Sequence, residues 1–510
     1  MTNRSCNWLG TARRMLALAG LLAASPGLAA DRAAVQAVAD TRLALRQQGF
    51  KTDLAEFNLS TSPELQARAA ILTNTVQARS AGIFPGHPNL LQPVGNDSAL
   101  VLWSLDALSR EGGSGANGSD RLTWADFRYH VNLHQAVYDP ACTALQSGSI
   151  RFSVDANRGS GLRLPHLAVV KDLAQTMGDR TLLALHDGHP AAAWTNLMAA
   201  TRLVTAYQPE PVEISHLVRF ACAVLAYNTA WEALQTNGWS QEQLARLQQE
   251  WESVDYFTSL PETAAFSRAC GMADCERERS GEDDPQPTYL EFVKESIQFP
   301  TALWSELDNR WAAARRRERG NFDAEQALML FYRDREVELR QAVKAPTWAA
   351  MEQLPGVTNL IPFRFPSQSR VAATMNIRAM GVAAQLRGPV FLSRAAEAEA
   401  LRRVLITAIA LERYRGGHGA YPKTLTDLTP VFLKTPRLDF MNGQPLHYRL
   451  SADGHFLLYS VGLDCVDNGG KLRRSGQIVG LERRRSPNAL PREYDLVWPL
   501  PATAATLGHE

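Results

Sequence analysis

Residues 397–425 read EAEALRRVLITAIALERYRGGHGAYPKTL and join a strong helical pattern to an abrupt end. Apolar residues recur every three or four positions, which predicts a helix over 397–414 with a broad buried face. They are Leu401, Val404, Leu405, Ala408, Ile409 and Leu411. Glycines then interrupt the pattern, and Pro422 disfavours helical backbone at the residue before it. The helix is therefore predicted to be buried and to end in the glycine-rich segment.

The residues after this helix carry strand and turn signals. Two runs alternate apolar and polar residues, PLHYRL at 445–450 and HFLLYSV at 455–461. They flank a turn at Asp453-Gly454 and predict an antiparallel hairpin. A last strand is predicted in EYDLVW, 493–498. Residues 391–500 are therefore expected to form a small α+β domain, with one helix on an antiparallel sheet.

Four segments of this domain, in this order, resemble the globular domain of the type II secretion major pseudopilins. They are ALERYRGGHGAYPKTLTDL (410–428), PLHYRL (445–450), FLLYSVGLDCVDNGG (456–470) and YDLVW (494–498). The resemblance covers residues 397–499, about a fifth of the chain. Pseudopilins begin with a processing site and a long hydrophobic helix that anchors them and forms the filament core. Because other structure precedes the module here, the resemblance implies a reused accessory or recognition domain rather than a filament subunit.

The resemblance also implies a calcium site. In those pseudopilins the loop after the strand YS(L/V)G holds calcium through aspartates and backbone carbonyls. The matching positions are Asp464 and Asp495, and Asp467 and the carbonyl of Val466 lie nearby in the sequence. Calcium takes six to eight oxygen ligands of this kind. The alternative is a turn of glycine and aspartate that needs no ion.

Residues 31–390 are predicted to form a helical domain that is loop-rich over 74–160. Gly188 and Pro190 mark the end of one helix and the start of the next. Ser240 and Gln243 form a capping box at the start of another. Successive helices joined by short turns predict antiparallel helical hairpins. Residues 501–510 are left as a tail.

The N-terminus has the pattern of a secretory signal peptide over residues 1–30. Arg13-Arg14 precedes a short apolar run at 15–24, and small residues follow. The run is too short for a membrane span, which needs about 20 residues. The protein is therefore expected in the periplasm or outside the cell, without a transmembrane segment after cleavage. The general and twin-arginine export routes both stay open.

The cysteines and histidines offer two further sites. Cys270 and Cys275 are close enough in sequence for a disulfide in an oxidising compartment. Zinc is the alternative, with poor ligand spacing. His130 and His134 stand four apart, so on a helix they share one face, as zinc-binding pairs do. No glutamate is adjacent to His130, and no third ligand is evident in that stretch.

Charge and motifs narrow the function. Lys and Arg total 53 and Asp and Glu total 52, which argues against a nucleic-acid binder. No serine nucleophile motif or phosphate loop stands in its required context. We therefore expect a non-enzymatic scaffold or recognition protein of the cell envelope, linked to secretion machinery and binding a protein or peptide. The alternatives are a metal-dependent hydrolase with a dispersed active site and a pseudopilin-type filament subunit.

Overall fold

The computed structural model describes residues 32–75, 87–88, 90–109, 121–280, 321–357, 375–473 and 494–502. Most of these residues are helical, and a small antiparallel sheet region accompanies the helices. The prediction of a mainly α protein is therefore confirmed. The predicted signal peptide, residues 1–30, lies outside the described residues.

The chain forms two compact units, which we call unit 1 and unit 2. Unit 1 comprises residues 1–56, 267–333 and 363–382, whereas unit 2 comprises residues 57–266, 334–362 and 383–510. Most of the predicted helical domain and the predicted C-terminal module thus belong to the same compact unit.

Unit 1 is built on α2 (Arg32–Gln47), η1 (Leu54–Glu56), most of α11 (Leu260–Ser280) and the start of α14 (Phe322–Ala342). Its apolar core consists of Val38, Leu45, Phe50, Met272 and Met329. The fully buried Glu325 carboxylate lies 2.9 Å from the guanidinium group of Arg42 and 2.7 Å from that of Arg279. These two cations compensate for the cost of burying the charge.

Cys270 and Cys275 lie on one continuous helix, α11, and both are buried free thiols. Five residues of α-helix rise about 7.5 Å along the axis. Disulfide-bonded Cα atoms lie within about 7 Å of each other. The predicted disulfide is therefore absent from this structure, because the helix holds the two residues too far apart.

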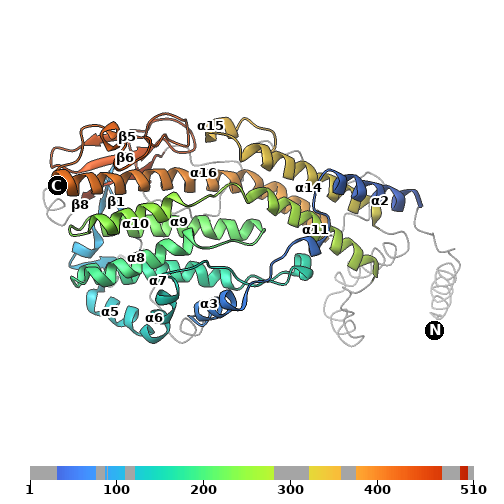
Figure 1. Cartoon of the computed structure of the whole chain (residues 1–510), viewed down its shortest axis with the longest axis horizontal. Coiled ribbons are helices and arrows are strands. Elements are labelled where there is room, and N and C mark those ends of the chain that lie inside the picture. The colour runs from blue at the N-terminus through green and yellow to red at the C-terminus, as the bar shows by residue number, and fades with distance from the viewer. Residues whose placement is uncertain are drawn as a thin grey trace, which may run out of the picture. The chain divides into compact units, whose positions relative to one another are not determined.

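Unit 2 contains most of the helices. They are α3 (Pro63–Thr73), α5 (Trp124–Asn132), α6 (Gln135–Ala144), α7 (His166–His186), α8 (Pro190–Thr205), α9 (Glu213–Leu234), α10 (Gln241–Glu252), α15 (Trp348–Met351) and most of α16 (Met375–His418), with the 3-10 helices η2 (Leu102–Ser104), η3 (Ala156–Gly161) and η4 (Leu425–Leu428). Helices α7, α8 and α9 lie side by side as consecutive hairpins (Figure 1). Gly188 has a φ of 71° after α7, Pro190 begins α8, and the capping box of Ser240 and Gln243 begins α10, all as predicted.

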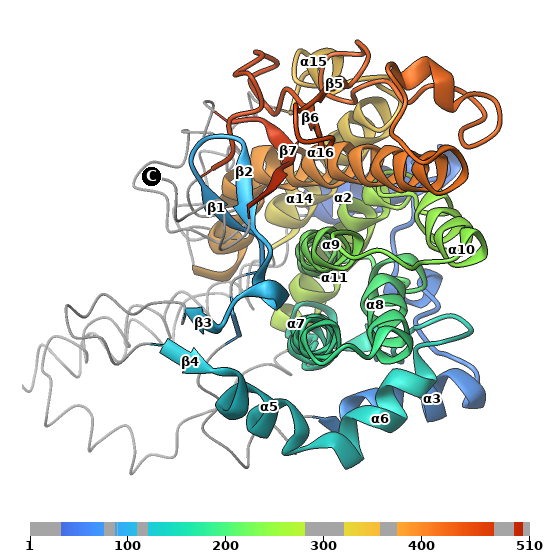
Figure 2. The same cartoon turned by 90° about the vertical axis from the view of Figure 1, so that its left-hand side faces the viewer.

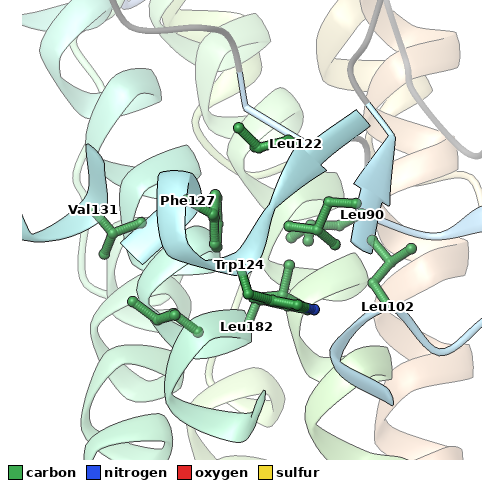
Figure 3. Close-up of a cluster of buried hydrophobic side chains, with 9 residues drawn as sticks. Leu90, Leu102, Leu122, Trp124, Phe127, Val131 and Leu182 are labelled. Carbon is green, nitrogen blue, oxygen red and sulfur yellow. The ribbon is translucent and has the colours of Figure 1, made fainter. Parts of the chain in front are cut away.

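A cluster of buried apolar side chains fastens the loop-rich segment to α7 (Figure 3). The cluster joins β3 (Ala107–Ser109), β4 (Arg121–Thr123) and α5 to Leu182 and Leu183 of α7. The ring of Trp124 also stacks on that of His186, with centroids 3.7 Å apart. Burial of large side chains therefore orders this segment despite its short elements.

Two three-stranded sheets occupy unit 2. In the first, β5 (His447–Leu450), β6 (Phe456–Ser460) and β7 (Leu496–Trp498) are antiparallel in the order β5-β6-β7. The predicted hairpin and last strand are confirmed. In the second, β1 (Gln92–Val94) pairs antiparallel with β2 (Ser98–Leu100), and β2 pairs parallel with β8 (Leu500–Ala502).

The predicted helix over 397–414 forms the C-terminal part of α16, which lies beside the first sheet in both views (Figures 1 and 2). It continues to His418, so the first two glycines after Arg415 are helical. Gly419, with a φ of 79°, then provides the left-handed residue that ends it.

The C-terminal residues are interlocked with the helices. Tyr227 Oη and Trp231 Nε1 of α9 donate to the carbonyls of Val497 (2.9 Å) and Pro499 (3.1 Å). Strand β8 follows at once, so the predicted tail from residue 501 begins inside a strand. α15 packs on the same module, because Trp348 Nε1 donates to the carbonyl of Leu463 at 3.0 Å.

Candidate functional site

Three aspartates are predicted to bind calcium: Asp464 and Asp467 lie in the loop after β6, and Asp495 directly precedes β7. Asp495 is only 2% exposed, and its carboxylate accepts the backbone N–H groups of Asn468 (3.3 Å), Gly470 (2.8 Å) and Lys471 (3.2 Å). Gly470 has a φ of 81°, which turns the backbone amides inward. Burial raises the pKa of Asp495 to about 6, although these amides favour the charged form.

The other two aspartates are more exposed. Asp467 accepts the N–H of Gly469 (2.8 Å) and the hydroxyl of Tyr459 (3.0 Å), and His447 Nδ1 lies 3.4 Å away. The Gly469 amide is the largest of the interactions that lower the pKa of Asp467. Asp464 accepts the N–H of Val466 at 3.2 Å. Each carboxylate therefore has a backbone donor as its partner.

The three carboxylates thus accept hydrogen bonds from nearby backbone N–H groups, as in a loop that needs no ion. Across the described ranges, no group of three or more His, Cys, Asp or Glu side chains is placed to hold a metal ion. Calcium would have to compete with the amide hydrogens that bind Asp495, and would draw its remaining oxygens from carbonyls and water. The calcium site remains a prediction that metal titration can test.

The predicted histidine pair is not on one helical face. His130 belongs to α5, whereas His134 is the residue that precedes α6, and the chain turns between the two helices. The sequence pattern failed here because the helical periodicity continues through a break that neither glycine nor proline marks.

Two polar networks in unit 2, one partly buried and one buried, were not predicted from the sequence. His87 Nδ1 lies 2.6 Å from the carboxylate of Asp179, a buried residue of α7. Burial raises the pKa of Asp179, and His87 opposes that shift. The two residues are 92 positions apart, so no local motif could have revealed the pair.

The second network is centred on Glu210. Its carboxylate is 2.9 Å from His166 Nε2 and accepts the hydroxyl of Tyr207 at 3.0 Å. Burial acts to raise the pKa of Glu210, but the hydrogen bonds, chiefly from His166, outweigh it and the pKa is lowered. Phe152 stacks on His166, with ring centroids 4.3 Å apart. The members of this network are buried and hydrogen-bonded to one another. The network therefore has the character of a structural contact that holds α7 to the α8–α9 connection.

His216 is an unusual buried group near the start of α9. It is 1% exposed, and neither ring nitrogen has a hydrogen-bond partner among the residues that the structure describes. Burial lowers its pKa to about 3, so the imidazole is neutral. The rings of Phe220 and Phe391 lie 6.4 and 6.0 Å from it.

Comparisons of the chain with protein-family models, curated proteins and solved structures give no significant match. The resemblance of residues 397–499 to pseudopilins therefore remains an expectation drawn from the sequence. Among the described helices, none is both long and apolar enough to cross a membrane.

Proposed function

We propose that the protein is a non-enzymatic scaffold or recognition protein of the cell envelope, in which a pseudopilin-like module is fixed within a helical body and presents a surface to a protein partner. Export rests on the signal pattern at residues 1–30, and the link to secretion machinery rests on the resemblance of residues 397–499.

The enclosure of α16 carries this proposal. Every residue from Val404 to Leu411 is buried, at 2% exposure or less. Eight residues make more than two turns, so this part of α16 is covered on all sides. On one side the hydroxyl of Tyr421 donates to Glu412 at 2.6 Å, beside the sheet. On another, Gln241 of α10 donates to the carbonyl of Arg413 at 2.7 Å.

A filament core requires an apolar helix that is free to pack between subunits, and residues 404–411 of α16 are not available for such packing. This observation favours a fixed module over a filament subunit. The surface left for recognition is then the outer part of the module and the helices of unit 2, where α-helical hairpins and sheet edges offer the usual means of binding peptides.

The test is purification of the tagged full-length chain from cells after chemical cross-linking. We expect the same partner in repeated preparations from the envelope fraction. A control chain without residues 1–30 should stay in the cytoplasm and lose that partner. Homopolymers of the chain, or a chain recovered alone that turns over a substrate, would contradict the proposal.

A hydrolase is the second candidate, and the pair of His87 and Asp179 favours it. A buried carboxylate that orients an imidazole is the arrangement of a general base. If the chain hydrolyses any ester or phosphoester in a substrate panel, His87→Ala and Asp179→Asn should both reduce the rate. A rate unchanged by either substitution would remove this candidate.

A further inference from the structure

Strand β5 forms one edge of the β5-β6-β7 sheet. One hydrogen bond shows which of its backbone groups point toward β6 and which point outward. Ser451 N–H donates to the carbonyl of His455 at 2.8 Å, which makes this a hydrogen-bonded pair of the antiparallel ladder. Such pairs alternate with pairs whose backbone groups point away from each other. From the register Leu450↔Phe456, the N–H and C=O groups of Tyr448 and Leu450 therefore point outward from β5.

These outward groups lack a hydrogen-bond partner among the described residues, and Leu450 is 43% exposed. β5 is an end strand in the order β5-β6-β7 and contains no proline. The other three-stranded sheet differs, because Pro93 and Pro501 stand at the centres of its two end strands. Proline on an edge strand removes a donor and prevents strand addition. β7 is the other end strand of the first sheet, and it lies against α9, whose Tyr227 hydroxyl donates to the carbonyl of Val497. Among the end strands of these two sheets, β5 is thus the one left able to accept a strand.

The two faces beside this edge differ in chemistry. Tyr448 and Leu450 lie on the face of Phe456, which is apolar. On the opposite face Arg449 pairs with Asp97 at 2.6 Å, and His447 lies beside Asp467. Of these two partly exposed carboxylates, Asp97 is paired with a guanidinium group, whereas Asp467 has a histidine beside it, so added positive charge near Asp467 is favoured.

We propose that β5 is the docking edge for an extended segment of another protein, which adds as a fourth strand. The segment alternates apolar residues, which contact Tyr448 and Leu450, with lysine or arginine near Asp97 and Asp467. The inference rests on the recognition role proposed above and specifies how that partner is bound: backbone hydrogen bonds give affinity and alternate side chains give specificity.

The test uses the full mature chain and a fluorescent hexapeptide of alternating valine and lysine as the probe. We expect saturable binding, and slower hydrogen exchange at the amides of Tyr448 and Leu450. The amide of Arg449 faces β6 and should already be protected, which provides an internal reference. A peptide N-methylated at every residue should not bind, because it has no amide hydrogen to donate.

Three substitutions distinguish an effect on the β5 edge from an effect on the fold. Leu450→Pro removes an outward N–H and should weaken binding by about tenfold while leaving the thermal melt nearly unchanged. Leu450→Ala keeps that N–H and should stay within about threefold of wild type. Arg449→Pro removes a ladder N–H and should lower the melting temperature.

Other results would overturn the inference. Peptide binding that Leu450→Pro leaves unchanged, or no binding at all, would exclude strand addition at β5. A concentration-dependent dimer abolished by Leu450→Pro would assign the edge to a second copy of this chain instead. If an envelope partner is recovered but still binds the Leu450→Pro variant, the proposed function survives and the edge does not. If the chain is found in the cytoplasm but binds the peptide through β5, the docking edge survives and the proposed envelope function does not.

Discussion

Replacing Gly462 with alanine probes the contact between the end of β6 and the start of β7. Gly462 has a φ of 70°, and a Cβ built there would lie 2.5 Å from the carbonyl oxygen of Tyr494. This is a backbone atom, next to Asp495, and cannot turn away as a side chain can. Gly469 is the matched control, because its φ is 75° and its Cβ would meet nothing within 4 Å.

Both substitutions place alanine in the left-handed region, at a cost of about 1 kcal/mol each. Gly462→Ala should also force the strands apart, which costs a further 1–3 kcal/mol or so, as in overpacked cores. We expect the free energy of unfolding in urea to fall by about 1 kcal/mol for Gly469→Ala and about 2–4 kcal/mol for Gly462→Ala. Equal losses in the two variants would show that Tyr494 does not pack on Gly462, and the described junction of β6 and β7 would be wrong.

Three further predictions concern buried groups and calcium. The carboxylate of Glu232 accepts the N–H of Leu102, and burial raises its pKa to about 8; the stability linked to its proton is complete below pH 4.5 and lost as pH rises through 8. Unfolding free energies of the wild type should therefore fall over this window relative to Glu232→Gln, and parallel curves would refute the assignment. His216→Leu should leave the free energy of unfolding in urea unchanged or raise it by about 1 kcal/mol. A loss of stability would instead show that the imidazole has a hydrogen-bond partner. Calcium should raise the melting temperature of the full chain and EDTA reverse it, with no effect in Asp464→Asn; an EDTA-insensitive melt would count against the site.

Local patterns in the sequence predicted the elements of the C-terminal module well. The hairpin at β5 and β6, the last strand and the glycine-rich end of α16 depend on neighbouring residues, and all are present. The sequence predicted a broad buried face for this helix, whereas residues 404–411 are buried on every side. The run LITAIAL at 405–411 is apolar on almost every side of the helix, which is consistent with that burial. Sequence periodicity alone did not show which elements would cover those sides.

Pairings between distant residues were beyond the sequence. The parallel ladder of β2 and β8 joins segments about 400 positions apart, and three-residue strands have no detectable period. The pair of His87 and Asp179 is of the same kind. The expected disulfide is absent for a different reason: Cys270 and Cys275 are close in sequence, but helix α11 runs through both residues and separates them.

The most direct test of the account is whether the C-terminal residues are built into the helical body through β8. In the register of β2 and β8, Ser98 faces Leu500, and Ala502 lies two residues further along. Mass spectrometry of oxidised protein should find a cross-link in the double variant Ser98→Cys with Leu500→Cys, and far less in Ser98→Cys with Ala502→Cys. Equal cross-linking in both, or none in either, would contradict the parallel pairing and leave the module as a separate domain.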